Sequence, residues 1–405
     1  MTYRLGVLVS HPIQYLSPWF RHLANKLDLE VFYAHRQSAR GQAEAGFGVE
    51  FDWDVPLLEG YSYRWLTNVA RQHGLRSFGG CDTPEIYDII QHGRFDAFLV
   101  FGWNRKSSIQ AILACKRTGT PVLMRGDSQL NSTRSPLKSA AKFIPYRLLL
   151  PRLDGHLYVG KRNKEYLQHY GVREDRLFFV PHFVDNDYFA RSAKRSEVSS
   201  DSLRIRDELG IPRDAFVFIY AGKMIPEKRP QDFIQALSKI LYTQTSPNIH
   251  ALLIGDGPMR SFLEKLAKPH SDRIHFVGFQ NQTRLPLFYQ ASDALILPGQ
   301  ETWGLVVNEA AACGIPSVVS DAAGCATDLI EEGVTGYTFP MGDVNALAGS
   351  LSVLMQALAS DRSALYGGLK RVVSLYSIEK ATKGLAQALQ GVTEGRAGTL
   401  LKAAR

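Results

Sequence analysis

Runs of consecutive apolar residues alternate with helix-like segments along most of the chain. RLGVLV, LEVFYA, AFLVF, PVLM, HLYV and LFFVP occur within the first 180 or so residues, and FVFIYAG, HALLIG, IHFVG, ALILP, PSVVS and GYTF follow. Strands that are apolar throughout are typical of parallel sheets covered by helices on both faces. Two such series predict two doubly wound α/β domains.

The domain boundaries follow from polarity. A segment rich in Ser and charged residues separates the two series, and such a composition is typical of a linker or an exposed edge. We therefore place one domain at 1–190, a linker at 191–210 and a second domain at 211–377. The remaining residues, 378–405, are expected to form a closing helix whose end frays.

Composition favours an ordinary globular protein, with 405 residues of which 45% are apolar and 21% charged. The start of the sequence lacks signal-peptide features and no apolar run approaches the roughly 20 residues that span a bilayer, so we expect a cytoplasmic protein. Four scattered cysteines indicate neither a zinc site nor a disulfide framework. Residues 1–185 carry most of the formal net charge of +8, which favours an anionic partner for this half.

The residues that follow the predicted strands are the first candidates for chemistry, because open parallel sheets bind ligands outside the carboxyl ends of their strands. Nearly every such exit combines glycine with a polar or charged residue. The exits include His11, Arg125–Asp127, Gly222–Lys223, Gly278–Phe279 and Gln300–Glu301. The pattern predicts two site-bearing edges that face one another across a cleft.

The segment ETWGLVVNEAAACG places Glu301 and Glu309 on either side of a predicted helix start near Gly304. A buried carboxylate costs free energy unless it is paired or hydrogen-bonded, so Glu309, whose neighbours are apolar, needs a partner. Carboxylates suit the vicinal hydroxyls of a sugar, and the first backbone N–H groups of a helix suit a phosphate. For Glu301 the alternative is a glutamate that only favours the helix dipole.

Two lysines, Lys223 and Lys228, flank a proline turn directly after a predicted strand. Together with a helix N-terminus they can hold a diphosphate without a metal ion, and a solvated surface is the alternative interpretation. Other phosphate motifs are weaker: the third glycine of a dinucleotide fingerprint falls on Arg260, and no P-loop sequence occurs.

At this point the sequence resembles the retaining GT-B glycosyltransferases of family 4, most strongly over residues 211–340. AGKMIPEKRPQDFIQAL, LLIGDGPMR, IHFVGF, YQASDALILPGQETWGLVVNEAAACGIPSVVSDAAG and LIEEGVTGYTF occur in the family's order, and VSHPIQYLSPWFRHL and VPHFVDNDYF are similar to segments of bacterial members. The resemblance implies an α/β protein of GT-B fold, in which two Rossmann-like domains face one another across a cleft and the last helix crosses back to the first domain.

The resemblance also implies roles for individual residues. Glu301 would bind hydroxyls of a donor sugar, Glu309 the ribose, and Lys223 with Lys228 the diphosphate. Gly278 and Phe279 would lie near the nucleobase. The other donor-site residues that it implies are Gly222, Thr302, Trp303, Gly304 and Leu305, the last two through their backbone amides.

The activity implied by this resemblance is transfer of a sugar from a UDP- or GDP-linked donor to a glycan or glycolipid acceptor, with retained anomeric configuration, in bacterial cell-surface polysaccharide assembly. We expect no cofactor and no nucleic-acid partner. We also expect no metal, because the D-x-D triplets at Asp52–Asp54 and Asp185–Asp187 are of a kind that often occurs by chance. Alternatives are a catalytically inactive nucleotide-sugar-binding protein or partner subunit, and a GT-B sugar-nucleotide epimerase.

The sequence departs from the family pattern in both halves. Lys223 stands where the family usually has Arg, which keeps the charge but gives up the planar fork. The first half has His11 and Arg125–Asp127 where the family often has a glycine pair and a His. We expect Asp127 to contact the donor sugar or the acceptor, and His11 and Arg125 to line the cleft; a turn-capping Asp and a surface His are the alternatives.

A basic segment, 134–152, forms the last candidate site. It contains five cations and no acid, namely Arg134, Lys138, Lys142, Arg147 and Arg152. Such a segment with an apolar flank can lie on an anionic membrane surface and reach a lipid-linked acceptor. An ordinary packed helix with solvated lysines is the other interpretation, because Pro145 interrupts the pattern.

Overall fold

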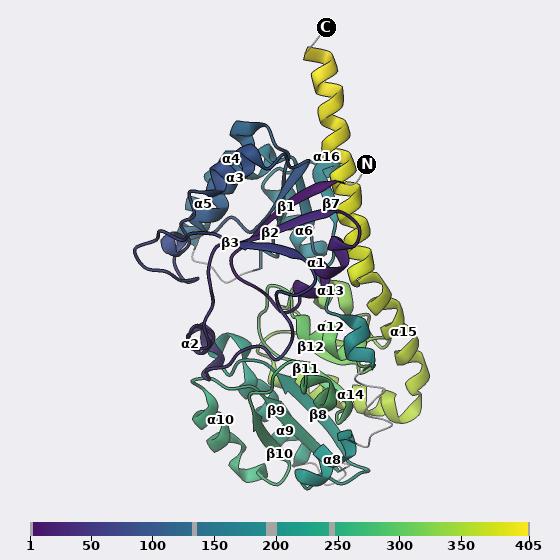
Figure 1. Cartoon of the computed structure of the whole chain (residues 1–405). Helices are drawn as coiled ribbons and strands as arrows, with labels where there is room; N and C mark the ends of the chain where they lie inside the picture. The colour runs from purple at the N-terminus through teal and green to yellow at the C-terminus, as the bar shows by residue number, and fades with distance from the viewer. Residues whose placement is uncertain (1–2, 132–135, 192–200, 243–247, 404–405) are drawn as a thin grey trace. The chain divides into compact units, whose positions relative to one another are not determined.

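The computed structural model of the chain describes residues 3–131, 136–191, 201–242 and 248–403. The chain forms two compact units, each built on its own parallel sheet (Figure 1). The first unit comprises Met1–Ser38, Pro56–His182 and Ile378–Arg405, and the second comprises Ala39–Val55 and Phe183–Ser377. The chain therefore passes between the units four times.

The first unit holds, within its described residues, a parallel sheet of seven strands in the order β3-β2-β1-β4-β5-β6-β7. Apolar side chains on both faces bury the central strands, as the continuous apolar runs predict. The strand order reverses between β1 and β4, which pair directly. The strands are β1 (Arg4–Val9), β2 (Asp28–Tyr33), β3 (Ser62–Trp65), β4 (Ala97–Phe101), β5 (Val122–Arg125), β6 (Gly155–Tyr158) and β7 (Leu177–Phe179).

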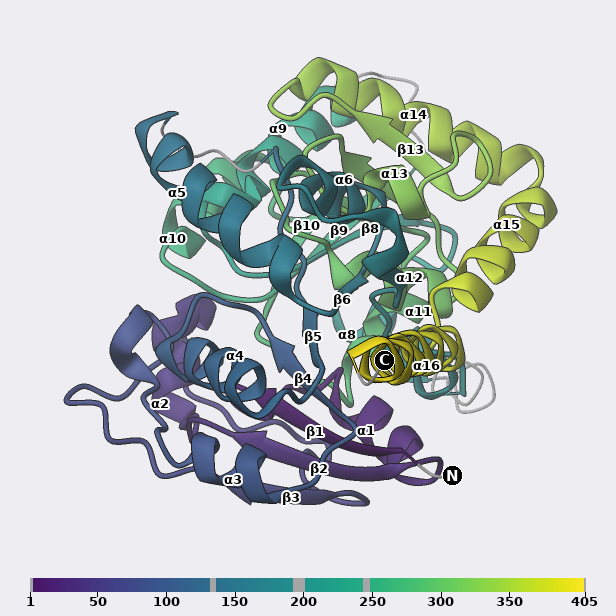
Figure 2. The same ribbon diagram turned by 90° about the horizontal axis from the view of Figure 1, so that it is seen from above.

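Helices cover this sheet, and the last of them returns from the far end of the chain. Trp19 donates from Nε1 to Thr382 Oγ1 over 3.1 Å, and Gly384 lies so close to the carbonyl of Phe179 that a Cβ would be 1.9 Å from its oxygen. Figure 2 looks nearly along this last helix. The helices are α1 (Ser17–Ala24), α3 (Ile86–His92), α4 (Lys106–Thr118), α5 (Pro136–Leu149), α6 (Lys161–His169) and α16 (Ile378–Ala403), with short 3-10 turns at Phe78–Gly80, Leu150–Arg152 and Glu174–Arg176.

The second unit repeats the architecture with six described parallel strands in the order β10-β9-β8-β11-β12-β13. The order reverses between β8 and β11, which also pair directly. Both sheets are thus doubly wound, which confirms the α/β fold class predicted from the sequence. The strands are β8 (Phe216–Ala221), β9 (Ile249–Ile254), β10 (Ile274–Gly278), β11 (Ala294–Leu297), β12 (Ser317–Ser320) and β13 (Gly336–Phe339).

The helices of the second unit supply the other half of its apolar core. Leu347, Leu351 and Leu354 recur on one face of a long helix and are fully buried against the sheet. The helices are α2 (Ala39–Gln42), α8 (Asp201–Glu208), α9 (Pro230–Leu241), α10 (Arg260–Ala267), α11 (Leu285–Gln290), α12 (Leu305–Ala312), α13 (Ala326–Leu329), α14 (Val344–Ser360) and α15 (Arg362–Leu375), with a π-helical turn at Ala43–Phe47 and 3-10 turns at Pro226–Lys228 and Lys268–His270.

Two segments take places that the sequence did not suggest. Ala39–Val55 lies between β2 and β3 in the chain yet groups with the second unit. Within 191–210, where we expected a linker, Asp201–Glu208 forms α8 and buries Ile205, while residues 192–200 lie outside the described part. Both segments are polar or irregular in sequence, so no apolar period indicates what they contact.

Within the basic segment, Pro136–Leu149 forms one helix, α5, which continues through Pro145, and the 3-10 turn Leu150–Arg152 follows it. Arg134 lies outside the described residues. From residue 141 onwards the helix is largely exposed, including Phe143 and Ile144. None of the described helices combines the length and the apolar character that a membrane crossing requires.

Candidate functional site

The topology of the second sheet brings Lys223 and Glu301 to the same edge of the sheet. From β8 the sheet continues through β9 and β10, and from β11 it continues in the opposite direction through β12 and β13. The loops that follow β8 and β11 therefore lead away from one another. Open α/β sheets bind their ligands at this kind of switch point. Lys223 follows β8 and Glu301 follows β11, which places the predicted cation and carboxylate together.

Lys228 and Glu301 form an ion pair at the switch point, and one fifth of each side chain is exposed. Burial and the nearby Lys223 ammonium lower the pKa of Lys228 to about 8. The charge of Glu227 opposes this shift, because an opposite charge favours the ionised form. The pair is therefore a charged group held in partly desolvated surroundings, where its interactions with a ligand are stronger than in water.

The backbone fixes the geometry of this ion pair. The amide of Gln300 donates to the carbonyl of Glu227 over 3.0 Å, which ties the exit of β11 to the turn that carries Lys228. Gly299 permits the approach, because a Cβ there would lie 2.4 Å from the backbone of Lys228. On the other side, the amide of Gly324 donates to the carbonyl of Glu301 over 3.0 Å.

Helix α12 begins directly after this site. Its N-cap is Gly304, with φ 114° and no side-chain capping bond, so the first amides of the helix have no side-chain acceptor of their own cap. A Cβ at Gly304 would lie 2.8 Å from Leu297 Cδ2 and 3.1 Å from Cys325 Sγ, which explains why glycine occupies this position. The positive end of the helix dipole and the first backbone N–H groups of α12 suit an anion.

Glu309, in the second turn of α12, is buried with 7% of its surface exposed. The Tyr289 hydroxyl donates to Glu309 Oε2 over 2.7 Å. Burial raises the pKa of Glu309 to about 7, and hydrogen bonds from Tyr289 and Gln282 oppose the rise. The sequence predicted that Glu309 needs a partner, and the partner is Tyr289, a residue that the sequence analysis did not single out.

Thr302 and Trp303 occupy different environments. Thr302 is exposed, whereas Trp303 is buried and donates from Nε1 to Asn308 Oδ1 over 2.8 Å. The Trp303 ring packs on Tyr376 with centroids 5.7 Å apart. The indole of Trp303 therefore holds the start of α12 in place from the interior.

Glycines pack closely at the ends of β8, β9 and β10. The amide of Gly222 donates to Ile254 over 3.0 Å, and the amide of Gly255 donates to Gly278 over 2.9 Å. A Cβ at Gly255 would lie 2.0 Å from the carbonyl oxygen of Gly222. The rim beside Lys223 is thus made of backbone, which a flat ligand can approach closely. Phe279, half-buried, marks its outer end.

The first unit places Arg125 in its interior. The guanidinium donates to the carbonyls of Val180 and Pro181, and only 2% of the residue is exposed. Burial lowers the pKa of Arg125 to about 10. Arg125, which we expected to line a cleft, instead joins the exits of β5 and β7.

Beside Arg125, half of the Asp127 side chain reaches solvent, and its carboxylate lies 4.0 Å from Nε2 of the buried His182. Tyr15 packs edge-on against the His182 ring at 5.9 Å, and burial raises the pKa of Tyr15 to about 12. Burial holds the pKa of His182 well below its usual value. Sequence reasoning missed His182, although its place after a strand in VPHFVDNDYF was an available signal.

His11 follows β1 and is half-buried, with Nδ1 2.9 Å from Ser10 Oγ. Burial and the charge of Arg105 lower the pKa of His11 to about 4, so the imidazole is neutral near pH 7. Throughout the described ranges, no group of three or more His, Cys, Asp and Glu side chains gathers closely enough to hold a metal ion. Asp54 of the first D-x-D triplet instead accepts from the amide of Thr283 over 3.2 Å.

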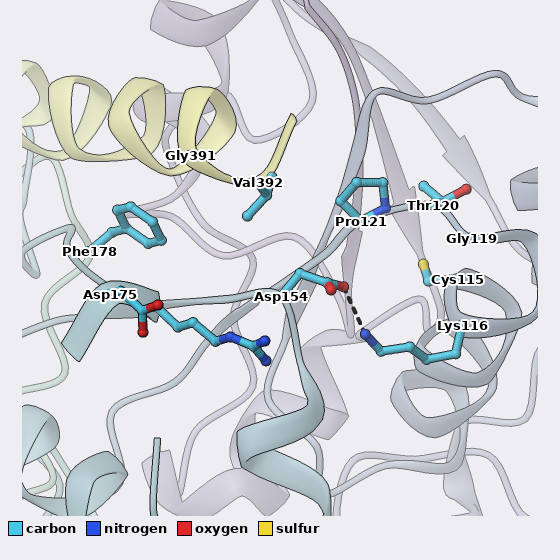
Figure 3. A pocket seen from close by; sticks show the side chains of 11 residues that line it. Cys115, Lys116, Gly119, Thr120, Pro121, Asp154, Asp175, Phe178, Gly391 and Val392 are labelled. Atoms are coloured by element: carbon cyan, nitrogen blue, oxygen red, sulfur yellow. Dashed lines mark hydrogen bonds and ion pairs between the residues drawn. The ribbon is translucent and has the colours of Figure 1, made fainter. Parts of the chain in front are cut away.

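A hollow of about 410 Å³ lies at the amino ends of β5, β6 and β7 in the first unit (Figure 3). Lys116 is paired there with Asp154 over 2.8 Å, and Arg176 donates to two carbonyls. Its charged groups are satisfied within the protein, and it occupies the sheet edge opposite to the strand exits described above.

Comparison with known proteins agrees with this geometry. Residues 201–363 match the family described as glycosyl transferases group 1. This segment of the chain is therefore similar to that family. The matched segment contains Lys223, Lys228, Glu301 and Glu309.

Two bacterial proteins illustrate what the chain is similar to. It is 32% identical to N-acetyl-alpha-D-glucosaminyl L-malate synthase of Bacillus anthracis over 44% of each chain. It is 22% identical to UDP-Gal:alpha-D-GlcNAc-diphosphoundecaprenol alpha-1,3-galactosyltransferase of Escherichia coli over 66% of this chain and 68% of that one. The chain spans about half the length of several curated relatives that it matches.

The fold is also shared along nearly the whole chain. The structure of HepE from Anabaena in complex with UDP and glucose superimposes with a TM-score of 0.70 and 17% identity, covering 96% of this chain and 99% of that one. At this identity the likeness shows the fold, which is that of the GT-B glycosyltransferases.

Proposed function

We propose that this protein is a retaining glycosyltransferase that uses a nucleotide diphosphate sugar. The single observation that carries the proposal is the Lys228–Glu301 ion pair, held by the backbone at the switch point of the second sheet beside the N-terminus of α12. This arrangement offers a carboxylate to sugar hydroxyls and cations with backbone amides to a diphosphate, within one site.

The proposed reaction needs positioning and charge stabilisation more than a protein nucleophile. The acceptor hydroxyl oxygen forms a bond to the anomeric carbon while the bond from that carbon to the diphosphate oxygen breaks on the same face of the sugar. The acceptor proton passes to the departing phosphate oxygen, and nucleoside diphosphate leaves. Lys223, Lys228 and the α12 amides stabilise the charge that grows on the diphosphate. No metal ion or cofactor enters this proposal.

Each carboxylate has a separate part. Glu301 accepts hydrogen bonds from the donor sugar, and its pairing with Lys228 places that ammonium where the adjoining diphosphate lies. Glu309 accepts from the ribose, with Tyr289 fixing the orientation of the carboxylate. The nucleobase lies along the glycine rim near Gly278 and Phe279. UDP is the first nucleotide to test, because HepE of the same fold was solved with UDP and glucose.

The acceptor is proposed to be a glycan or a lipid-linked sugar of cell-surface polysaccharide assembly. Support comes from the name of the Escherichia coli relative, which acts on a diphosphoundecaprenol-linked sugar. The exposed face of α5 supplies a place to meet an anionic membrane: Ile144 is 66% exposed and Leu148 53%, with Lys142 and Arg147 also exposed. In this proposal the protein works in the cytoplasm at the membrane surface.

The test is calorimetric titration of the full chain with UDP, GDP and ADP in the presence of EDTA. We expect one diphosphate to bind, and Glu309→Ala to weaken that binding at least tenfold, since loss of a charged hydrogen-bond acceptor costs roughly 1.5–3 kcal/mol. Binding that requires Mg²⁺ or Mn²⁺ would overturn metal independence. Absence of binding for all three nucleotides, with and without metal, would overturn the donor site itself.

A further inference from the structure

A segment from the first half of the sequence packs on the second unit at Phe279, beside which we propose that the nucleobase binds. We name Ala39–Val55 the aromatic arm; it contains α2, labelled in Figure 1, and the π-helical turn that follows. The chain enters it after Ser38 and leaves it at Pro56, between two strands of the other unit. An excursion of this kind costs chain entropy, so the contacts at its end must compensate for that cost.

Aromatic packing attaches the arm to Phe279. The Phe51 and Phe279 rings lie with centroids 4.1 Å apart at 32°, and Phe47 meets Phe279 edge-on at 5.9 Å. Trp53 packs edge-on against Phe51 at 5.0 Å. Aromatic pairs in these geometries stabilise beyond the area that they bury. The arm thus contacts the residue next to which we place the nucleobase.

Polar contacts fix the register of the arm along this edge. Asn281 Nδ2 donates to the carbonyl of Asp52 over 2.7 Å, and the Thr283 amide donates to the Asp54 carboxylate over 3.2 Å. Gly48, with φ 75°, lies against the backbone of Gly257, and a Cβ there would be 3.2 Å from its nitrogen. In this arrangement Phe47 lies against Lys223.

The decisive contact is between Phe47 and Lys223. The ammonium nitrogen lies 4.3 Å from the centroid of the Phe47 ring. Gly46, with φ 99° within the π-helical turn, brings the backbone alongside the same lysine, since a Cβ there would lie 3.5 Å from Lys223 Cδ. Burial lowers the pKa of Lys223 and so disfavours the charged ammonium form of this side chain. The π face counters this by favouring the ammonium over the neutral amine.

We infer that Phe47 is a positioning residue, which holds the Lys223 ammonium at the place where a donor's diphosphate binds. Lysine is a point charge on a flexible four-carbon stem, so its orientation must come from its surroundings. The Phe47 ring and the backbone at Gly46 lie beside the Lys223 side chain and restrict where its ammonium can move. This inference rests on the proposed function, because it needs a diphosphate in the site.

The test is a double-mutant cycle on nucleotide affinity, measured by calorimetry with UDP and, in parallel, GDP and ADP. Phe47→Leu keeps the apolar bulk and removes the ring, Phe47→Tyr keeps the ring, and Lys223→Met removes the charge. We expect Phe47→Leu to weaken binding about three- to tenfold in the wild-type background and to have no effect in the Lys223→Met background. Phe47→Tyr should bind as the wild type does.

Phe51→Leu is the matched control, because its ring belongs to the arm without lying over Lys223. Its effect on affinity should be the same in both backgrounds. A Phe47→Leu effect that is equal with and without Lys223, or no effect at all, would overturn the positioning role and leave the proposed function intact. If no nucleotide binds any of these proteins, wild type included, the proposed function fails, and the role of Phe47 fails with it.

Discussion

The Tyr289 hydroxyl donates a hydrogen bond of 2.7 Å to the carboxylate of Glu309, and so links α11 to the helix whose N-terminus opens onto the switch point. This carboxylate is buried, and its pKa is raised from 4.5 to about 7. The folded protein therefore binds the proton more tightly than the unfolded chain. The resulting stabilisation is fully present below about pH 4.5 and is lost as the pH rises through about 7.

Glu309→Gln should consequently stabilise the protein above pH 7, because the amide can still accept from Tyr289 and has no charge to bury. We expect the free energy of unfolding at pH 8 to rise by roughly 1–3 kcal/mol, with little change at pH 4.5. Urea denaturation of both proteins at the two pH values measures this. Glu264→Gln, at a half-exposed position, is the control and should be neutral. Equal effects at both pH values would contradict the raised pKa of Glu309.

Glu301→Gln should separate recognition of the sugar from recognition of the diphosphate. The amide cannot neutralise Lys228 and is a weaker acceptor, so UDP-glucose should lose its advantage over UDP. Affinity for UDP itself should hold or rise, because one negative charge has left the diphosphate site. Transfer from a competent donor should fall roughly 100-fold or more.

Calorimetry with both ligands and a rate assay measure the outcome for Glu301. Glu379→Gln on α16 is exposed and serves as the matched control for loss of one carboxylate. Transfer at the wild-type rate by Glu301→Gln would remove Glu301 from the proposed mechanism.

Charges placed on α5 test the membrane proposal. Ile144→Glu with Leu148→Glu should lower the fraction of protein that sediments with anionic liposomes at low salt about tenfold or more, since burial of each side chain contributes roughly 1.5–3 kcal/mol. Phe262→Glu is the control, because Phe262 is also 53% exposed but lies on α10 of the second unit. Equal sedimentation of all three proteins would rule out α5 as the contact.

Two glycines should respond in opposite ways to the same substitution. Gly304→Ala meets Leu297 Cδ2 at 2.8 Å and a φ of 114°, so it should destabilise the protein by roughly 1–3 kcal/mol and weaken nucleotide binding at α12. Gly349→Ala, in the middle of α14 with nothing within 4 Å, should stabilise by roughly 0.5–1 kcal/mol. Denaturation midpoints of the two variants decide the comparison.

The sequence predicted the strands well because their apolar runs are a local property. RLGVLV and AFLVF coincide with β1 and β4, and the start of α12 falls next to Gly304 as expected. Burial of Glu309 also followed from its apolar neighbours. Each of these features depends on residues within one turn or one strand, which a pattern of hydrophobicity records directly.

The partners of the site residues depend on contacts between distant segments, so local patterns did not reveal them. Nothing near Arg125 in the sequence indicates that the carbonyls of Val180 and Pro181 receive its guanidinium. In the sequence, Tyr289 looks like any other aromatic residue of a helix. Its hydrogen bond to Glu309 arises only because the fold brings α11 next to α12. The roles assigned to Glu301 and Lys223 in binding a donor remain predictions for the experiments above, and the role assigned to Asp127 remains a prediction.

The four passages of the chain between the two units limit how the protein can be divided. A fragment that starts at Phe183 and ends at Ser377 would hold the whole six-stranded sheet but would lack the aromatic arm, leaving Phe279 uncovered. A fragment that ends at His182 would lack α16, which covers β6 and β7. Neither fragment should express well alone. Each should fold more readily when its missing segment is joined to it, Ala39–Val55 to the fragment that starts at Phe183 and Ile378–Arg405 to the fragment that ends at His182.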